Sequence, residues 1–407
     1  MPAFLSFLIY YSIPFLLVLT LVVTIHEMGH FLVARAFGVA VDRFSIGFGR
    51  TLFSWRDKSG TEWRIALIPL GGYVRFAGDA DASSSVPDAD DLDQLRQQIT
   101  QRQGDAALKR YFAFKPVWQR ALVVAAGPIA NFILAICIFA SLTFALGADV
   151  WAPKIGSVQA GSPAAKAGLL VGDEIVEIDG APIQDFRDIS QHVRLRSGEP
   201  IRLLVRRAGQ VQTIEAIPVR RVWTDPLTGR AAELGFLGVG QSRDPADFRH
   251  VRYTPVEALG HGVQSTWDIL ATTVIYLERI FQGRESPNQL GSFIGMAQTS
   301  GAVAKAAAHS TPDFGLKLVN ITLSLLGLSA VLSTGIGFMN LLPVPILDGG
   351  HLMFYAYEAV ARRPVSASIQ AIGQRLGLAL LLGLMLFATW NDLQQQSVFQ
   401  KLGGLFF

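Results

Sequence analysis

Two histidines and a glutamate stand close together near the start of the chain, in the segment His26-Glu27-Met28-Gly29-His30. On a helix, residues four apart lie on one face, so both imidazoles can reach a single metal ion. Glu27 lies about a hundred degrees around the helix from His26, close enough to contact a metal-bound water without binding the metal. This spacing is a zinc signature with a general base. It predicts His26 and His30 as zinc ligands and Glu27 as the proton acceptor.

A catalytic zinc ion takes three protein ligands and keeps one position open, so a third ligand is needed. Soluble enzymes with this signature take it from a glutamate about twenty residues on or from a histidine six residues beyond the second. Here position 36 is Ala36, and no glutamate follows before Glu62. The third ligand must therefore come from elsewhere in the chain. Asp348 is our candidate, because it directly follows the uncharged run Leu318 to Leu347.

The segment around Asp348 reads NLLPVPILDGGH over residues 340 to 351. Pro343 and Pro345 cannot continue a helix, so the backbone is free to turn the carboxylate toward a neighbour. Gly349 and Gly350 carry no side chain and let another backbone approach closely. We therefore expect Asp348 to meet the two histidines. His351 is a supporting or structural candidate, since a fourth ligand would close the open position.

The elements that carry these residues read as membrane spans. Half of the 407 residues are hydrophobic and only 16% are charged, a balance that soluble domains of this size rarely show. A helix needs about 20 mainly apolar residues to cross a bilayer. Three uncharged stretches meet this length, and the fourth does so if residues 371 to 373 extend it. The stretches are Met1 to Ile25, Ala121 to Ala148, Leu318 to Leu347 and Leu376 to Asn391.

Other classes of protein fit the composition less well. A secretory signal peptide needs a basic start, which the first segment lacks. One cysteine, Cys137, forms no internal disulfide and no thiolate cage for zinc. The net charge of +3, without basic clusters among aromatic residues, argues against nucleic acid as a partner. Ionisable groups inside a span are costly and indicate a function, which favours a metal site over a chance pair of histidines.

Charge asymmetry predicts the orientation of the spans. Lys and Arg are frequent between Phe31 and Arg120 and absent before His26. By the positive-inside rule this loop faces the cytoplasm, so the metal site lies toward the cytoplasmic side. Alternation of sides then puts the long loop from Asp149 to Lys317 outside. The exits of the first and third spans share one side, so their ligands can meet.

The outer loop begins with a small soluble domain. Residues 161 to 183, GSPAAKAGLLVGDEIVEIDGAPI, predict a short helix at Pro163 to Ala167, a strand at Glu174 to Ile178 and a hairpin turn at Asp179-Gly180. Alternating runs predict further strands at 201 to 205 and 211 to 217. The fingerprint resembles a bacterial PDZ domain, present once and closing near Gly240. Such domains bind an extended peptide or chain end along a sheet edge.

Two further segments are open to more than one interpretation. Residues 255 to 283 show apolar side chains at helical spacing, which fits a helix on the membrane surface and equally one packed in a core. The acidic and Ser-rich stretch from 79 to 103 predicts a solvated insert rather than a metal site, because its carboxylates lack a rigid spacing.

Taken together, these motifs resemble the site-2 protease family of intramembrane metalloproteases, in particular the bacterial regulator of sigma-E protease type. The resemblance is carried by the His-Glu-x-x-His at 26 to 30, the Leu-Asp-Gly motif ending at Gly349 and the PDZ fingerprint between them. LGGYVRFAG at 70 to 78 resembles the membrane-associated β-loop of the family, and GPIAN at 127 to 131 is a further match. The single PDZ domain and the acidic insert depart from some relatives.

The resemblance implies a zinc metalloprotease in the bacterial inner membrane that cuts single-span proteins, such as anti-sigma factors or remnant signal peptides, within or near their transmembrane segments. Lipid, and a peptide or ectodomain at the PDZ domain, would be its other partners. Asn340 would hydrogen-bond substrate backbone or the oxyanion. Because a helical substrate must be unwound, an edge strand could take over its hydrogen bonds; an ordinary hairpin is the alternative. That edge is Gly71, Gly72, Tyr73 and Val74.

The fold class expected is a polytopic α-helical membrane protein with about four transmembrane helices, a membrane-associated β-hairpin region and an inserted α+β PDZ domain. Asn131 and Asn391 are predicted to hydrogen-bond between helices. A PDZ scaffold with structural zinc and a metal transporter are the rival functions. The expected segments are 1–36 (first span), 37–116 (cytoplasmic loop with β region), 117–148 (second span), 149–240 (PDZ domain), 241–313 (helical region), 314–351 (third span), 352–371 (loop) and 372–407 (fourth span and tail).

Overall fold

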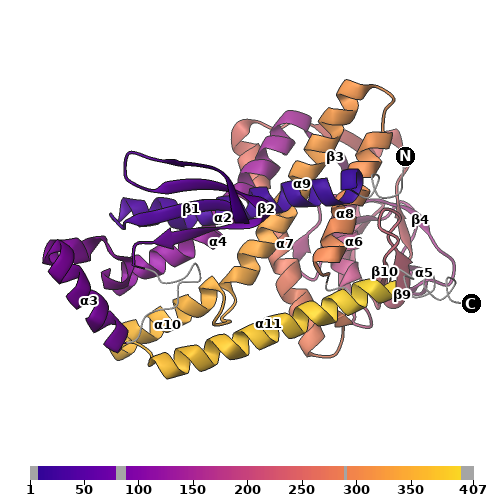
Figure 1. Ribbon diagram of the computed structural model, residues 1–407. Coiled ribbons are helices and arrows are strands. Elements are labelled where there is room, and N and C mark those ends of the chain that lie inside the picture. The colour runs from indigo at the N-terminus through magenta and orange to yellow at the C-terminus, as the bar shows by residue number, and fades with distance from the viewer. Residues whose placement is uncertain (1–7, 79–88, 288–290, 396–407) are drawn as a thin grey trace, which may run out of the picture. The chain divides into compact units, whose positions relative to one another are not determined.

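The computed structural model describes residues 8–78, 89–287 and 291–395 (Figure 1). The chain divides into two compact units, which are described separately. The first unit comprises 1–139, 262–270 and 291–392, and holds the residues of the zinc signature. The second comprises 140–261, 271–290 and 393–407.

Four helices in the described part of the chain are long and apolar enough to cross a membrane: Tyr10–Ala36, Val117–Leu146, Phe314–Leu341 and Ser368–Gln394. They overlap the four uncharged stretches of the sequence, so the number of helices long and apolar enough to span a membrane agrees with the prediction, although the first lies further along the chain than the expected Met1 to Ile25. The helical elements that contain them are α2 (Ile13–Ala36, after a short π-helical turn Leu8–Ser12), α4 (Val117–Leu146), α9 (Phe314–Leu341) and α11 (Ala367–Gln395).

The ends of these helices follow local signals. Pro14 lies in the first turn of α2, where its missing N–H costs nothing. The Asp313 side chain accepts a hydrogen bond from the backbone N–H of Leu316 and caps α9. The α9 helix stops at Leu341, before the two prolines, and a separate helix α10 (Asp348–Ala361) begins at Asp348. Asp348 therefore opens a new helix after the third span instead of ending the span.

Between the first two spans lie two long strands, β1 (Val41–Arg56) and β2 (Glu62–Phe76), which pair in antiparallel register (Figure 1). One end of this pair packs on α2 in a core that includes Phe31, Phe44, Val74 and Phe112. The other end carries exposed apolar side chains, which are Phe48, Leu52, Phe53, Leu67, Ile68 and Leu70. Residues 41–76 therefore form paired strands with an apolar surface at their outer part, and the association of this region with the membrane stays a prediction.

The rest of the first unit is helical. The acidic segment forms a helix, α3 (Ala89–Gln103), while residues 79–88 lie outside the described part. Short 3-10 turns at Asp105–Arg110 and Phe112–Phe114 lead to α4. Helix α8 (Phe293–His309) precedes α9, and the buried Asp392 carboxylate of α11 accepts hydrogen bonds from the backbone N–H groups of Ser292 and Gly295 at its start.

The second unit contains an antiparallel four-stranded sheet in the order β6-β5-β7-β8. Its bounds are β5 (Glu174–Ile178), β6 (Ala181–Pro182), β7 (Ile201–Arg207) and β8 (Gln210–Ala216). Helices α5 (Pro163–Lys166) and α6 (Phe186–Arg194) contribute to one apolar core with the sheet. Asp179 and Gly180 both have positive φ, at 50° and 87°, as the predicted tight turn requires. The predicted strands and short helix are confirmed.

Three strand pairs complete the second unit: β4 with β11, β3 with β12, and β9 with β10. Their bounds are β3 (Ala148–Trp151), β4 (Ile155–Val158), β9 (Val219–Thr224), β10 (Ala231–Phe236), β11 (Val239–Gln241) and β12 (Phe248–Val251). A 3-10 turn, Pro245–Asp247, precedes β12. The predicted helix after the domain is α7 (Pro255–Phe281), capped by reciprocal hydrogen bonds between Thr254 and Glu257.

Candidate metal centre

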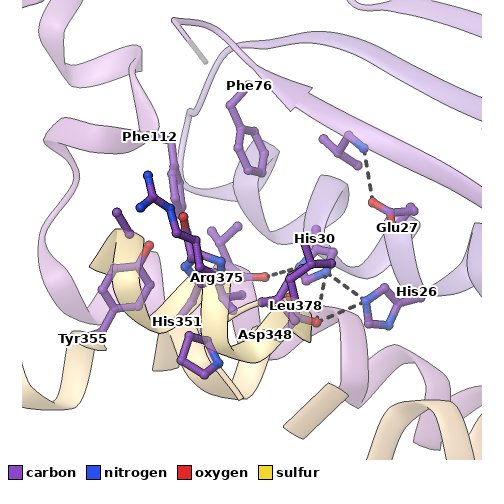
Figure 2. Close-up of a pocket in the computed structure, with 17 residues that line it drawn as sticks. His26, Glu27, His30, Phe76, Phe112, Asp348, His351, Tyr355, Arg375 and Leu378 are labelled. Carbon is purple, nitrogen blue, oxygen red and sulfur yellow. Dashed lines mark hydrogen bonds and ion pairs between the residues drawn. The ribbon is translucent and has the colours of Figure 1, made fainter. Parts of the chain in front are cut away.

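His26 and His30 occupy successive turns of α2, and Asp348 reaches them from the first turn of α10 (Figure 2). The Oδ2 atom of Asp348 lies 3.1 Å from His26 Nε2 and 3.5 Å from His30 Nε2. The two Nε2 atoms are 3.2 Å apart. Residues more than three hundred positions apart in sequence thus place three potential ligand atoms side by side.

The spacing of these three atoms fits a zinc ion. Zinc binds histidine nitrogen and carboxylate oxygen at about 2.0–2.2 Å, so tetrahedral ligand atoms lie about 3.3–3.6 Å from one another. The observed separations of 3.1–3.5 Å are close to this value. The three side chains are 9%, 12% and 19% exposed, which leaves little access for competing water. The donor set of two imidazoles and one carboxylate is one that catalytic zinc uses.

Helix α4 supports both imidazoles from behind. The Nδ1 atom of His30 lies 2.9 Å from the carbonyl oxygen of Val123, and the Nδ1 atom of His26 lies 3.3 Å from the amide nitrogen of Asn131. Gly29, between the histidines, makes this approach possible, because a Cβ there would lie 2.2 Å from the Ala126 carbonyl oxygen. The predicted helix-to-helix contact of Asn131 is confirmed, and its partner is a residue of the site.

Glu27 points away from the three ligand atoms toward strand β2 (Figure 2). Its Oε2 atom accepts a hydrogen bond from the backbone N–H of Val74, at 3.1 Å. A Cβ at Gly72 would lie 2.6 Å from the Ser45 carbonyl oxygen and 3.6 Å from the Glu27 side chain, so glycine lets the strands and the helix approach closely. The edge of β2 and the carboxylate are therefore in direct contact.

A cavity of about 650 Å³ opens beside the three ligand atoms. Its walls are largely apolar, and strand β2, helix α4, the turn before α10 and helix α11 all contribute. Three polar side chains outside the histidine and carboxylate cluster also reach it: His351, Gln374 and Arg375. Figure 2 shows Arg375 and Leu378 of α11 beside Phe112 and Asp348. The apolar residues that line the cavity are Val74, Phe76, Phe112, Val123, Val124, Pro345, Ile346, Tyr355, Ala371 and Leu378.

Helix α10 is held in place by a buried ion pair. The Arg120 guanidinium of α4 donates to the Glu358 carboxylate at 2.6 Å and lies over the Tyr355 ring, 4.9 Å from its centroid. At the start of α10, burial by itself raises the pKa of Asp348, but hydrogen bonds and charge from His26 and His30 outweigh it and lower that pKa. The lowered pKa favours the carboxylate form of Asp348, which is the form that binds a metal.

The close approach of α10 to α9 also depends on glycine, as the sequence predicted. A Cβ at Gly349 would lie 2.2 Å from the Leu341 carbonyl oxygen, and one at Gly350 would lie 2.3 Å from that of Val344. The backbone that approaches is the turn directly before Asp348. His351 lines the cavity without joining the ligand atoms, and burial lowers its pKa.

The structure brings together His26, Glu27, His30, Asp348 and Val74, as expected from the sequence. Asn340 lies in the last turn of α9 and is absent from the described lining of the cavity. Gly71, Gly72 and Tyr73 belong to β2 but also lie outside that lining.

Sequence reasoning missed three features of the site: the Val123 carbonyl, the close packing at Gly127 and the Arg375 side chain. The first two share a face of α4 with Asn131, but no sequence signal shows that this face meets the imidazoles. A cation within the predicted extension of the fourth span could have indicated Arg375.

Comparison with known proteins decides the family. The model of Peptidase family M50 matches residues 14–384, which include all the residues of the site. The chain belongs to Peptidase family M50. This confirms the resemblance to the site-2 proteases and identifies an M50 metallopeptidase.

Relatives in the M50 family align over almost the whole chain. Metalloprotease MmpA of Caulobacter vibrioides is 48% identical over 394 residues, which cover 97% of this chain and 98% of the relative. The putative zinc metalloprotease Atu1380 of Agrobacterium fabrum is 42% identical, covering 95% and 97%. The putative zinc metalloprotease RC0203 of Rickettsia conorii is 31% identical, covering 94% and 98%. The likeness therefore includes the second unit as well as the metal site.

Proposed function

We propose that this chain is an intramembrane zinc metalloprotease that cuts single-span membrane proteins within or near their transmembrane segments. His26, His30 and Asp348 would hold the zinc ion, and Glu27 would be the general base. The convergence of the three ligand atoms to within 3.5 Å, beside a cavity and a second carboxylate, that of Glu27, is the observation that carries this proposal.

When bound, zinc lowers the pKa of a coordinated water to about 7 and polarises a peptide carbonyl. Glu27 would accept a proton from that water and pass it to the leaving amine. The hydrogen bond from the Val74 N–H fixes one carboxylate oxygen of Glu27, so the other oxygen is left for the proton.

The edge of β2 from Gly71 to Val74 is proposed to bind the substrate as an added strand. A transmembrane substrate has its backbone groups already paired, so it must exchange helical hydrogen bonds for new ones before the zinc can reach a carbonyl. The contact between Val74 and Glu27 supports this role, because it places the strand edge next to the base. For Asn340 we keep the prediction of a hydrogen bond to substrate backbone, outside the described cavity lining.

A matched pair of variants tests the proposed activity. Tagged single-span membrane proteins are co-expressed with the wild-type chain or with Glu27→Gln, and the cleavage products are mapped by mass spectrometry. Because general base catalysis contributes about 10²–10⁴-fold, Glu27→Gln should abolish detectable cleavage. It should still copurify with one zinc ion per chain. Cleavage that survives in Glu27→Gln would reject the assignment, and a wild-type protein without zinc would reject the metalloprotease.

The second unit is proposed to be a PDZ domain that filters substrates or holds an ectodomain. A cavity of about 330 Å³ lies between α6 and residues 234–239, where an extended peptide could bind. Ala148 and Val251 pair across β3 and β12, so a short Gly-Ser linker can replace residues 149–250. We expect this deletion to widen the range of substrates cut. An unchanged range would contradict filtering.

We propose a bacterial inner membrane location, as the resemblance to the site-2 proteases implies. The positive-inside rule supports an orientation with the metal site toward the cytoplasm, and alternation of sides then puts the PDZ domain outside. Cysteine accessibility labelling tests this topology: a cysteine at exposed Arg50 should be shielded from a membrane-impermeant reagent in spheroplasts, and one at Gln210 should react.

A further inference from the structure

The second transmembrane helix presents one face to both imidazoles. Val123, Gly127 and Asn131 are four residues apart on α4 and therefore share a face. The Val123 carbonyl contacts His30, and the Asn131 amide contacts His26. Between them, a Cβ at Gly127 would lie 2.3 Å from His30 Nε2 and 2.9 Å from His26 Cε1. This face of α4 is thus shaped to receive two imidazole rings that pack edge to face.

At His30 the backbone decides which ring nitrogen carries the proton. A carbonyl oxygen can only accept a hydrogen bond, so the Nδ1 atom 2.9 Å from the Val123 oxygen must be the donor. A neutral imidazole then has its lone pair on Nε2. That lone pair faces His26 and Asp348, as a metal ligand requires.

At His26 the partner of Nδ1 is the side-chain amide of Asn131, and an amide can either donate or accept a hydrogen bond. With the Asn131 amide nitrogen toward Nδ1, the ring proton lies on Nε2, where it occupies the ligand position beside Asp348. Exchanging the two ends of the amide turns Oδ1 toward Nδ1–H and leaves the Nε2 lone pair free. Asn131 is fully buried, at 0% exposure, and its Oδ1 atom has no hydrogen-bond partner in the described chain, so the oxygen is available for this role.

We propose that Asn131 is a positioning residue of the metal centre, whose Oδ1 accepts a hydrogen bond from His26 Nδ1–H and thereby directs Nε2 to the metal. The inference rests on the proposed function, because it requires zinc at His26, His30 and Asp348. It adds an asymmetry between the ligands. The support of His30 is a backbone carbonyl, which no side-chain substitution removes, whereas the support of His26 depends on one side chain.

Zinc affinity of the purified full-length protein, measured by competition with a chelator, tests this assignment. Asn131→Leu removes both amide groups at similar volume and should weaken zinc binding about 10–100-fold. Asn131→Asp keeps an acceptor and loses the donor, so it should stay within a few-fold of wild type. The matched control is Ser333→Ala. It removes the 2.8 Å hydrogen bond from the Ser333 hydroxyl to the Asn131 backbone carbonyl without touching the imidazole, and should bind zinc like wild type.

Two results would overturn the proposal: Asn131→Leu binding zinc as tightly as wild type, or Asn131→Asp binding as weakly as Asn131→Leu. The second would mean that the donor, not the acceptor, is needed. If Asn131→Asp does not purify as a monodisperse protein, the cobalt-loaded forms decide. The visible spectrum should change in Asn131→Leu and not in Ser333→Ala, and identical spectra would overturn the proposal. A wild-type protein that binds no zinc would instead reject the proposed function itself.

Discussion

Asp173 in the second unit and Asp348 in the first are both carboxylates with little access to solvent, at 1% and 19% exposure, but they have different neighbours. In the second unit, the Asp173 side chain is 1% exposed and meets the Arg207 guanidinium at 2.7 Å, with a further hydrogen bond from the Leu170 N–H. In the first unit, Asp348 meets only two imidazoles, and no Lys or Arg of the described chain pairs with it. The Asp173 carboxylate already has a guanidinium partner, whereas the Asp348 carboxylate faces two imidazoles.

The difference distinguishes a carboxylate that stabilises the fold from one that can bind a metal. A partly buried ion pair such as Asp173 with Arg207, or Arg120 with Glu358, neutralises itself and connects two elements. Two imidazoles and a carboxylate whose lone pairs converge are unfavourable unless a proton or a metal cation lies among them. Burial alone therefore does not identify a site. The site is identified by the convergence of three ligand atoms that require a cation among them.

The largest predicted effect is a difference in zinc binding between variants of the two carboxylates. Asp348→Ala should reduce zinc affinity by more than about 100-fold, since loss of a direct ligand exceeds the 10–100-fold effect of a supporting residue. Cleavage of single-span substrates should disappear with it. Asp173→Asn should leave zinc content and cleavage near wild type. Zinc analysis and substrate cleavage on the two purified variants check this, and a zinc-replete Asp348→Ala protein would contradict the assignment.

A smaller effect is expected at strand β2. Val74→Pro removes the N–H that donates to Glu27 and interrupts the strand edge, so cleavage should fall about 10- to 100-fold. Zinc content should remain at one ion per chain, because no ligand changes. Val74→Ala keeps the N–H and serves as the control for the lost side chain. Equal rates for the proline and alanine variants would show that the backbone donor is not needed.

Part of the second unit, its strands β5, β7 and β8, could be predicted because the signals for these strands are local. Alternation of apolar residues and the Asp179-Gly180 turn define strands β5, β7 and β8 over a few neighbouring residues. The proximity of the two histidines was equally predictable, because residues four apart on one helix lie on the same face. Asp348 required an argument about topology, and it succeeded because so few other charges follow the spans.

The rest of the site could not be predicted because backbone groups make several of its contacts. Nothing about the residue type of Val74 or Val123 indicates that its N–H or carbonyl contacts Glu27 or His30. Gly127 reads as helix packing until the imidazole atoms near its missing Cβ are known. The same holds for Arg375, because its place on a cavity wall depends on how α11 packs.

The smallest predicted effect is a dependence of stability on pH at Asp173. Burial alone raises the pKa of Asp173, but the Arg207 hydrogen bond and the Leu170 N–H outweigh it, so the pKa lies below its ordinary value. A lowered pKa in the folded state means that Asp173 contributes stability above about pH 4 and loses it as the pH falls through the folded pKa.

Asp173→Asn should therefore destabilise the second unit by about 2 kcal/mol near pH 7, and this difference should shrink below about pH 4. Hydrogen exchange of the β5 and β7 amides, corrected for the intrinsic exchange rate at each pH, measures it in the full-length protein. A difference that persists unchanged in acid would mean that Asp173 acts by packing alone. An ion pair stabilises the fold only while its carboxylate is charged, so its contribution must disappear when the carboxylate takes up a proton. If it does not disappear, Asp173 is not an example of a self-neutralised pair, and the contrast with Asp348 would depend on the metal site alone.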